Sequence, residues 1–221
     1  MKILAINGSP RKGWNTHTLL EKALEGAASA GAETELIHLY DLNCRGCLGC
    51  LGCKRRDGNS IGRCVVRDDL RPVLDKIAAC DGLILGSPIY IGEVTAAMRA
   101  LVERLTFQYI TYTKDARSYY EGKLPTGFLY TMNAPESVLE KVGYTAKFEA
   151  YRGLMQRLFD APASELLVTE TWQVEDYSKY TMNALNEDAR RQRRAEVFPQ
   201  DCQNAFAFGA ELANTAKNER A

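Results

Sequence analysis

Short apolar runs alternate with amphipathic stretches along this chain, and this alternation limits the folds open to it more than any other feature. The runs that have the length and composition of buried strands are 2–7, 33–42, 81–86, 125–131 and 164–171. Apolar residues repeat at helical spacing over 16–31, 68–79, from Val94 onward, and over 144–159. Strands that alternate with helices form a parallel sheet covered on both faces. The sequence therefore predicts a doubly wound α/β fold with five parallel strands, whose ligand site lies beyond their carboxyl ends.

Length and charge limit the domain organisation and the partners that the sequence predicts. The 221 residues, 46% of them apolar, suit one domain over 1–221, with a cysteine-rich excursion at 44–64 after the second strand and a mostly helical C-terminal extension at 175–221. The 28 basic and 28 acidic residues balance, so we expect no nucleic-acid or membrane partner. The first apolar run is too short for a signal peptide and no run is long enough to span a bilayer, which predicts a cytoplasmic protein.

Five of the seven cysteines fall between Cys44 and Cys64, and four of these follow one another at three-residue steps. Such spacing brings sulfurs to one side of a turn, as zinc and iron–sulfur centres require. In a reducing cytoplasm, dense cysteines indicate metal binding or redox chemistry rather than disulfides. Zinc ribbons use two separated CxxC pairs, whereas this run is contiguous, which favours iron–sulfur over zinc. Thiols that hold no metal remain a third interpretation.

The loop 8–16 follows the first predicted strand and precedes the first helix. Backbone N–H groups at the start of a helix, side-chain hydroxyls and an arginine are the donors that bind a phosphate. The loop lacks both the GxGxxG and the GK[ST] patterns, so a monophosphate is expected. The candidate phosphate ligands are Ser9, Arg11, Asn15 and Thr16. The structural alternative is that Ser9 and Asn15 only complete the turn and cap the helix.

Two later loops would meet the same edge of the sheet. In 86–92, proline restricts the backbone, Tyr90 offers an aromatic face and glycine permits close approach, all of which suit a planar ring. The loop at 131–135 adds hydrogen-bonding groups. The candidate ring contacts are Pro88, Ile89, Tyr90, Gly92, Thr131 and Asn133.

GSPRKGWNT, followed by LILGSPIYIGEVTAAMRALVER, resembles the flavodoxin-like NAD(P)H-dependent FMN reductases over the first four strands. The resemblance implies FMN, with its phosphate in the first loop and its isoalloxazine beside 88–92 and 131–133. It also implies NAD(P)H as a transient donor and a homodimer or homotetramer. We assign no catalytic residue, because the reactive atom would belong to the cofactor.

The segment DLNCRGCLGCLGCKRRDGNSIGRCVVRDDL resembles the iron–sulfur flavoproteins of the same superfamily, which carry a 4Fe-4S cluster near FMN. Its departures are the ten residues between Cys53 and Cys64 and the fifth thiol, Cys44. The ligands that this resemblance implies are Cys47, Cys50, Cys53 and Cys64, with Cys44 left over.

The expected function is FMN-dependent electron transfer between NAD(P)H or a protein donor and a small-molecule or protein acceptor, with a 4Fe-4S cluster beside the flavin. One alternative is a cluster-free reductase of quinones, nitro or azo compounds or flavin. Another is a cysteine-based redox or metal-sensing binding protein. The arginine run in EDARRQRRAE is expected to form a solvated helix face.

Overall fold

A central parallel sheet organises the computed structural model, which describes residues 1–114 and 117–220. Within those ranges the parallel strands are β1 (Lys2–Asn7), β2 (Glu33–His38), β3 (Gly82–Tyr90), β5 (Thr126–Thr131) and β6 (Ala163–Val168). Their spatial order is β2-β1-β3-β5-β6, and the two-residue strand β4 (Glu93–Val94) pairs antiparallel with the end of β3. Counting the parallel strands alone, this is the 2-1-3-4-5 order of flavodoxin-like sheets. The predicted fold class is confirmed.

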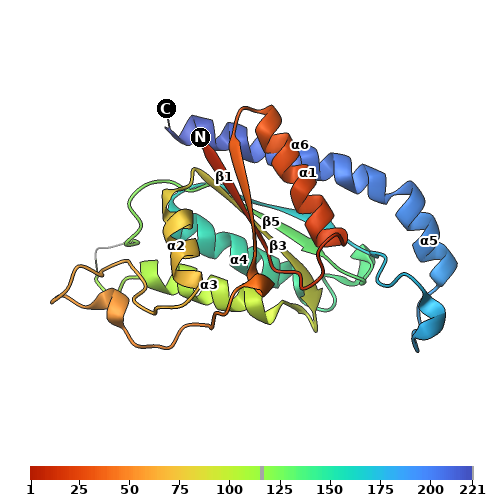
Figure 1. Ribbon diagram of the computed structural model, residues 1–221, viewed down its shortest axis with the longest axis horizontal. Coiled ribbons are helices and arrows are strands. Elements are labelled where there is room, and N and C mark those ends of the chain that lie inside the picture. The colour runs from red at the N-terminus through yellow and green to blue at the C-terminus, as the bar shows by residue number, and fades with distance from the viewer. Residues whose placement is uncertain (115–116, 221) are drawn as a thin grey trace.

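Helices cover both faces of the sheet (Figure 1). One face carries α1 (Asn15–Ser29) and α6 (Phe198–Arg220); the other carries α2 (Leu70–Ala79), α3 (Ala96–Tyr109) and α4 (Tyr144–Phe159). Alternate β1 side chains enter opposite cores: Ile3 packs on the α1/α6 side and Leu4 on the other, both fully buried. The short helix α5 (Glu187–Glu196) leads into α6. No helix in the described ranges combines the length and apolar character needed to cross a membrane.

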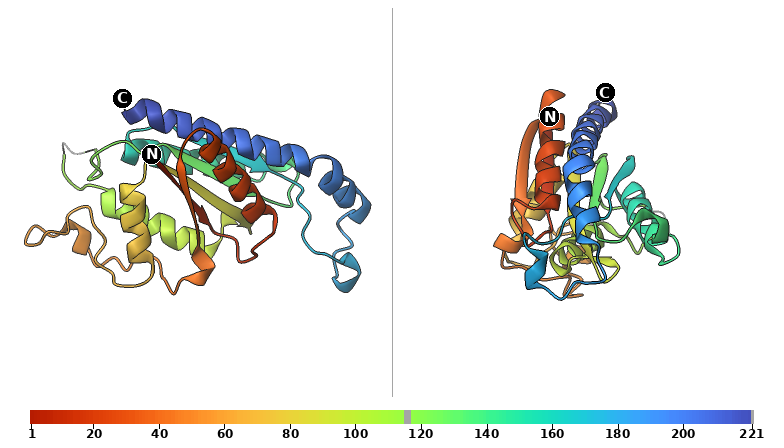
Figure 2. Two further views of the ribbon diagram at one scale, coloured as in Figure 1. Left: turned by 45° about the horizontal axis from the view of Figure 1, so that its top comes forward. Right: turned by 90° about the vertical axis from the view of Figure 1, so that its right-hand side faces the viewer.

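The first and last helices lie side by side in both views of Figure 2, and their backbones are in direct contact. A Cβ atom added at Gly26 of α1 would lie 1.9 Å from the Phe206 carbonyl oxygen. A Cβ at Gly209 of α6 would lie 1.7 Å from the Ala23 carbonyl oxygen. Only glycine fits at either position, so the C-terminal helix is a fixed part of the sheet's cover.

Three predicted strand ends are wrong, and one of them is the last strand, which was expected to reach residue 171 but ends at Val168. The third strand was expected to end at Gly86, but β3 continues to Tyr90 and pairs with β5 as far as Pro88–Thr131. The Leu83 N–H donates to the Pro125 carbonyl, on the β5 side of β3. Because the N–H groups of successive strand residues point to opposite neighbouring strands, the nitrogen of Pro88 points toward β1. The pairing of β1 with β3 ends at Gly86, before Pro88 is reached. A missing donor costs nothing there. The second strand was expected to reach residue 42, but it ends at His38, where a 3-10 turn, Leu39–Asp41, begins.

Candidate functional site

A cleft of about 460 Å³, open to solvent, lies beyond the carboxyl ends of β1, β3 and β5. The residues that line it are Ser9, Arg11, Trp14, Asn15, Thr16, Pro88, Ile89, Tyr90, Thr131, Met132, Asn133, Thr171 and Gln173. Nine of the ten predicted cofactor residues are therefore brought together, and Gly92 is the exception. Thr171 and Gln173 were missed, although they follow β6 and the strand-end rule that found the other loops applies to them as well.

The loop between β1 and α1 is preorganised by its own hydrogen bonds. The Ser9 N–H donates to Asn7 Oδ1 at 2.8 Å, and the Arg11 N–H donates to Ser9 Oγ at 3.2 Å. The residue before α1 is Trp14, and it makes no side-chain capping bond. The N–H groups of the first helical turn, which have no partner within a helix, are thus left for a ligand.

Hydroxyl groups join this loop to the neighbouring strand ends. Thr16 Oγ1 and Thr131 Oγ1 lie 2.8 Å apart, and both side chains are buried. Thr95, at the start of α3, donates its hydroxyl to the Gly8 carbonyl at 2.7 Å. The cleft floor is therefore fixed by β1, β5 and α3 together.

Asn15 is committed to protein partners. Its amide nitrogen donates to the Trp172 carbonyl at 2.7 Å, and its amide oxygen accepts from Arg194 Nη1 at 2.8 Å. A phosphate would therefore meet the backbone N–H of Asn15 rather than its side chain. Arg11 donates to the Gln173 carbonyl and lies 4.5 Å over the Trp14 ring, which holds its charge at the rim of the cleft.

The arginine run forms a helix without a buried residue, as predicted for a solvated face, but two of its arginines are held by protein partners. Arg190 pairs with Glu170 at 2.8 Å and donates to the Asn133 carbonyl at 3.1 Å. Arg194 stacks 3.7 Å over Phe198, and burial lowers the pKa of its guanidinium. Of the arginines in this run, Arg191 keeps a largely exposed side chain. Two arginines of α5 therefore support cleft loops from behind.

The side of the cleft where the sequence predicts a planar ring has two features, a tight β-hairpin and a buried hydrogen-bond acceptor. Ile91 and Gly92 form the β3–β4 turn with φ of +52° and +74°. Gly92 lies at this turn and does not line the cleft; a Cβ atom added to it would lie 3.1 Å from the Tyr144 ring. Asn133 Oδ1 is buried and has no hydrogen-bond partner among the described residues. It is an acceptor available to a ring N–H.

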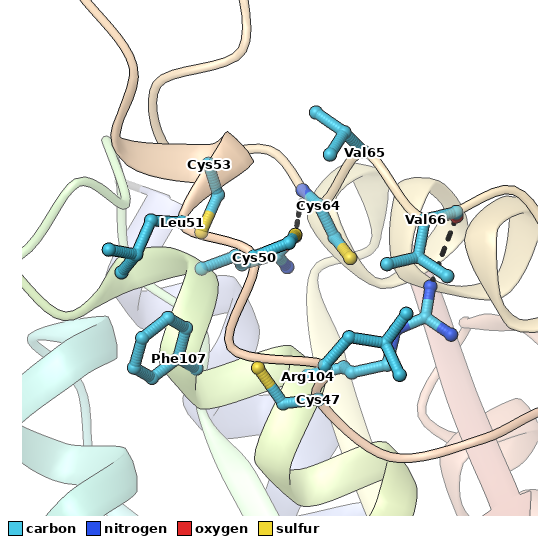
Figure 3. Close-up of a pocket in the computed structure, with 11 residues that line it drawn as sticks. Cys47, Cys50, Leu51, Cys53, Cys64, Val65, Val66, Arg104 and Phe107 are labelled. Atoms are coloured by element: carbon cyan, nitrogen blue, oxygen red, sulfur yellow. Dashed lines mark hydrogen bonds between the residues drawn. The ribbon is translucent and has the colours of Figure 1, made fainter.

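The predicted metal ligands line a second pocket of about 310 Å³ (Figure 3). Its lining comprises Cys47, Leu48, Cys50, Leu51, Cys53, Cys64, Val65, Val66, Arg104, Phe107 and Gln108. Cys44 lies outside it, and burial, together with Asp68, raises the pKa of that thiol. In residues 1–114 and 117–220, no three His, Cys, Asp or Glu side chains are close enough to hold a single metal ion. The four predicted ligands nevertheless line the same pocket.

One face of α3 holds the cysteine segment in place. Gln108 Oε1 accepts the Cys64 N–H at 2.9 Å, and Glu103 Oε2 accepts the Cys47 N–H at 3.3 Å. Arg104 Nη1 contacts Asp68 Oδ2 at 2.6 Å. These polar residues lie at helical spacing on one side of α3. The sequence prediction found only the apolar side of this helix; the spacing of 103, 104, 107 and 108 was the signal available.

Lys54 fastens the same segment to the end of α3. Its ammonium group donates to the carbonyls of Phe107 at 2.6 Å and Gln108 at 2.9 Å, and also to that of Ile110. Cations favour the carbonyl end of a helix. Burial lowers the pKa of Lys54. The cysteine segment is therefore anchored on both sides of the pocket.

Sheet order and the cleft at the strand ends together define a flavodoxin-like protein. Residues 1–132 match the model of the family described as NADPH-dependent FMN reductase. The chain belongs to this family of oxidoreductases, as its motifs predicted.

Curated relatives support the predicted branch. An iron–sulfur flavoprotein of Methanocaldococcus jannaschii is 42% identical over 104 residues, which are 47% of this chain and 51% of that protein. One of Methanosarcina thermophila is 36% identical over 104 residues, 47% of this chain and 52% of that protein. The chain spans about half the length of the curated relatives it matches.

Solved structures of low identity share the fold. An NAD(P)H:quinone oxidoreductase of Methanothermobacter marburgensis has a TM-score of 0.64 at 18% identity, covering 96% of this chain and 95% of its own. The azoreductase AzrA has a TM-score of 0.63 at 12% identity, covering 96% and 100%. At these identities the likeness concerns the fold alone.

Proposed function

We propose that this protein binds FMN in the cleft at the strand ends and transfers electrons between NAD(P)H or a protein donor and a small-molecule or protein acceptor. The observation that carries the proposal is the convergence of an uncapped α1 terminus with buried hydroxyls and the unpartnered Asn133 oxygen. These donors and acceptors fit a phosphate at one end of the cleft and a polar ring edge at the other.

The chain's own groups have separate tasks in this proposal. Ser9, Thr16 and the first-turn N–H groups hold the phosphate, and Arg11 adds charge at the rim. Pro88, Ile89 and Tyr90 pack against the ring, and Asn133 accepts from its edge. Bound FMN supplies the hydride and electron transfer, and no side chain is needed as nucleophile or general acid.

We further propose a 4Fe-4S cluster on Cys47, Cys50, Cys53 and Cys64. These four line one pocket and Cys44 does not, and the relatives above are named iron–sulfur flavoproteins. Such a centre supplies one-electron transfer. The buried guanidinium of Arg104 in the pocket wall suits an anionic ligand set, because thiolates and sulfides need a nearby cation when they leave water.

The cysteine pocket and the cleft share no lining residue. Helix α3 connects them: Thr95 at its start bonds the Gly8 carbonyl, and Arg104 lies in the cysteine pocket. At 1.5 Å rise per residue, these two positions are about 14 Å apart along the helix axis.

Anaerobic purification tests both parts. The proposal expects flavin absorbance with about one FMN, four irons and four acid-labile sulfides per chain. Flavin without iron or sulfide would leave a reductase of quinones, nitro or azo compounds or flavin. Steady NAD(P)H oxidation with a quinone would support reductase turnover, whereas reduction only by a ferredoxin would support a carrier.

The cysteine-based sensor remains a second candidate, favoured by the exposure of Cys50 and by the free state of all seven cysteines, which lie among the described residues. Its test is reversible loss of partner binding on oxidation in a protein without turnover. We place the protein in the cytoplasm, whose thiol pool keeps cysteines reduced, and propose a homodimer or homotetramer, to be checked by light scattering.

A further inference from the structure

The cysteine pocket contains a charged side chain with one unused donor. Arg104 is 1% exposed, and its Nη1 and Nη2 groups bond to Asp68 and to the Val66 carbonyl. Its third nitrogen, Nε, is buried without a hydrogen-bond partner among the described residues. Burying a donor without a partner costs roughly 1–3 kcal/mol. Helix α3, which also bonds the cysteine segment through Gln108, therefore places the Nε–H donor of Arg104 beside that segment.

A sulfur that could accept this hydrogen bond belongs to Cys64 in the same pocket. Figure 3 shows the Cys64 side chain directed toward Arg104, and both residues line the pocket. Cys64 itself is held by its backbone N–H on Gln108. Asp68 and Gln108 thus fix the guanidinium and the cysteine independently.

We propose that the Nε–H of Arg104 donates a hydrogen bond to the Cys64 sulfur in the cluster-loaded protein and raises the reduction potential of the centre. The inference rests on the proposed 4Fe-4S site. When the centre accepts one electron, no bond forms or breaks and Arg104 keeps its proton. The added negative charge is spread partly over the ligand sulfurs, so a donor and a cation at Cys64 stabilise the reduced form more than the oxidised one.

Arg104→Lys isolates this contact, because lysine keeps the charge and can still pair with Asp68 but has no Nε–H. Arg152→Lys is the matched control. Arg152 also has a buried Nε, which lies 3.3 Å from Glu165 Oε2 as an ion pair without hydrogen-bond geometry, and it lines neither pocket. We expect Arg104→Lys to weaken reduction about tenfold, a fall of about 59 mV for one electron. Arg152→Lys should leave the potential unchanged.

The decisive readout uses the unmodified sequence. Protein made with ¹⁵N-labelled arginine, anaerobically loaded and reduced with dithionite, should show an arginine-nitrogen coupling in pulsed electron paramagnetic resonance that disappears in Arg104→Lys. Iron and sulfide present without this coupling would overturn the role of Arg104 alone, as would an unchanged potential in loaded Arg104→Lys. A protein that takes up no iron or sulfide would overturn this role together with the proposed cluster.

Discussion

Arg194 donates its Nη1–H to the Asn15 side-chain oxygen at 2.8 Å, which joins residues 179 positions apart in the chain. The bond ties α5 to the first residue of α1, where the phosphate of FMN is proposed to lie. Stacking on Phe198 fixes the guanidinium from the other side. The C-terminal extension therefore supports the loop after the first strand, where the site is predicted.

Arg194→Ala should weaken FMN binding. Without the guanidinium, the Asn15 amide loses one of its two partners and the start of α1 is less rigid. We expect the Kd for FMN to rise about tenfold, equivalent to about 1.4 kcal/mol. Flavin fluorescence titration measures it. Arg191→Ala, on the exposed side of α5, is the control and should bind normally; equal affinities in both variants would contradict the supporting role.

Gly26→Ala should destabilise the fold strongly. The added methyl would meet the Phe206 carbonyl at 1.9 Å, so α1 and α6 must separate. Overpacking of this kind costs about 1–3 kcal/mol or more. Gly153→Ala in α4 is the matched control: nothing lies within 4 Å of its Cβ position, and we expect a gain of about 0.5–1 kcal/mol. Urea unfolding compares them, and a similar loss in both would refute the crossing.

Thiol labelling should distinguish the cysteines by environment. Burial raises the pKa of Cys80 to about 12, so that group stays a protonated, inaccessible thiol at pH 8. Cys50 is exposed. Iodoacetamide should modify Cys50 and spare Cys80 in the native metal-free protein, as read by peptide mass spectrometry. Both should react in denaturant, and rapid native labelling of Cys80 would show that its helix end opens.

Glu35 should make stability depend on acid. Bonds from Lys2 and Lys76 hold its pKa below the usual range. A carboxylate with a lowered folded-state pKa stabilises the fold above its ordinary unfolded pKa, and this contribution is lost as pH falls through the lowered value. Glu35→Gln should lower Tm at pH 7 by no more than about 3 °C, because the pair is screened by solvent. Thermal scans from pH 7 to 3 should converge for the two proteins; a difference that persists in acid would exclude the ion pairs as its cause.

The sequence predicted the elements best where local pattern and tertiary packing agree. Helix α4 has the predicted bounds, 144–159, because its apolar spacing matches the face it buries. The end of β3 was wrong because Pro88 normally stops a strand, and only the sheet shows that its nitrogen faces an unpaired side.

The sequence predicted the residues of the cleft, but it did not predict the arginines that support the site. Strand-end loops meet at one edge by topology, so the cleft residues were found from their positions. Arg104 and Arg194 were not, because a charged helix residue is buried only when a distant segment supplies its partner. Asp68 and Asn15 are those partners, and no local periodicity points to them.

The contact of Gly26 with Phe206 also affects when this protein can complete its folding during synthesis. On the ribosome, β1 and α1 emerge long before α6, the helix that covers them. The apolar surface that α6 covers therefore stays exposed until residues 198–220 have left the ribosome. Synthesis of α6, rather than formation of any early unit, is the step that closes this side of the sheet.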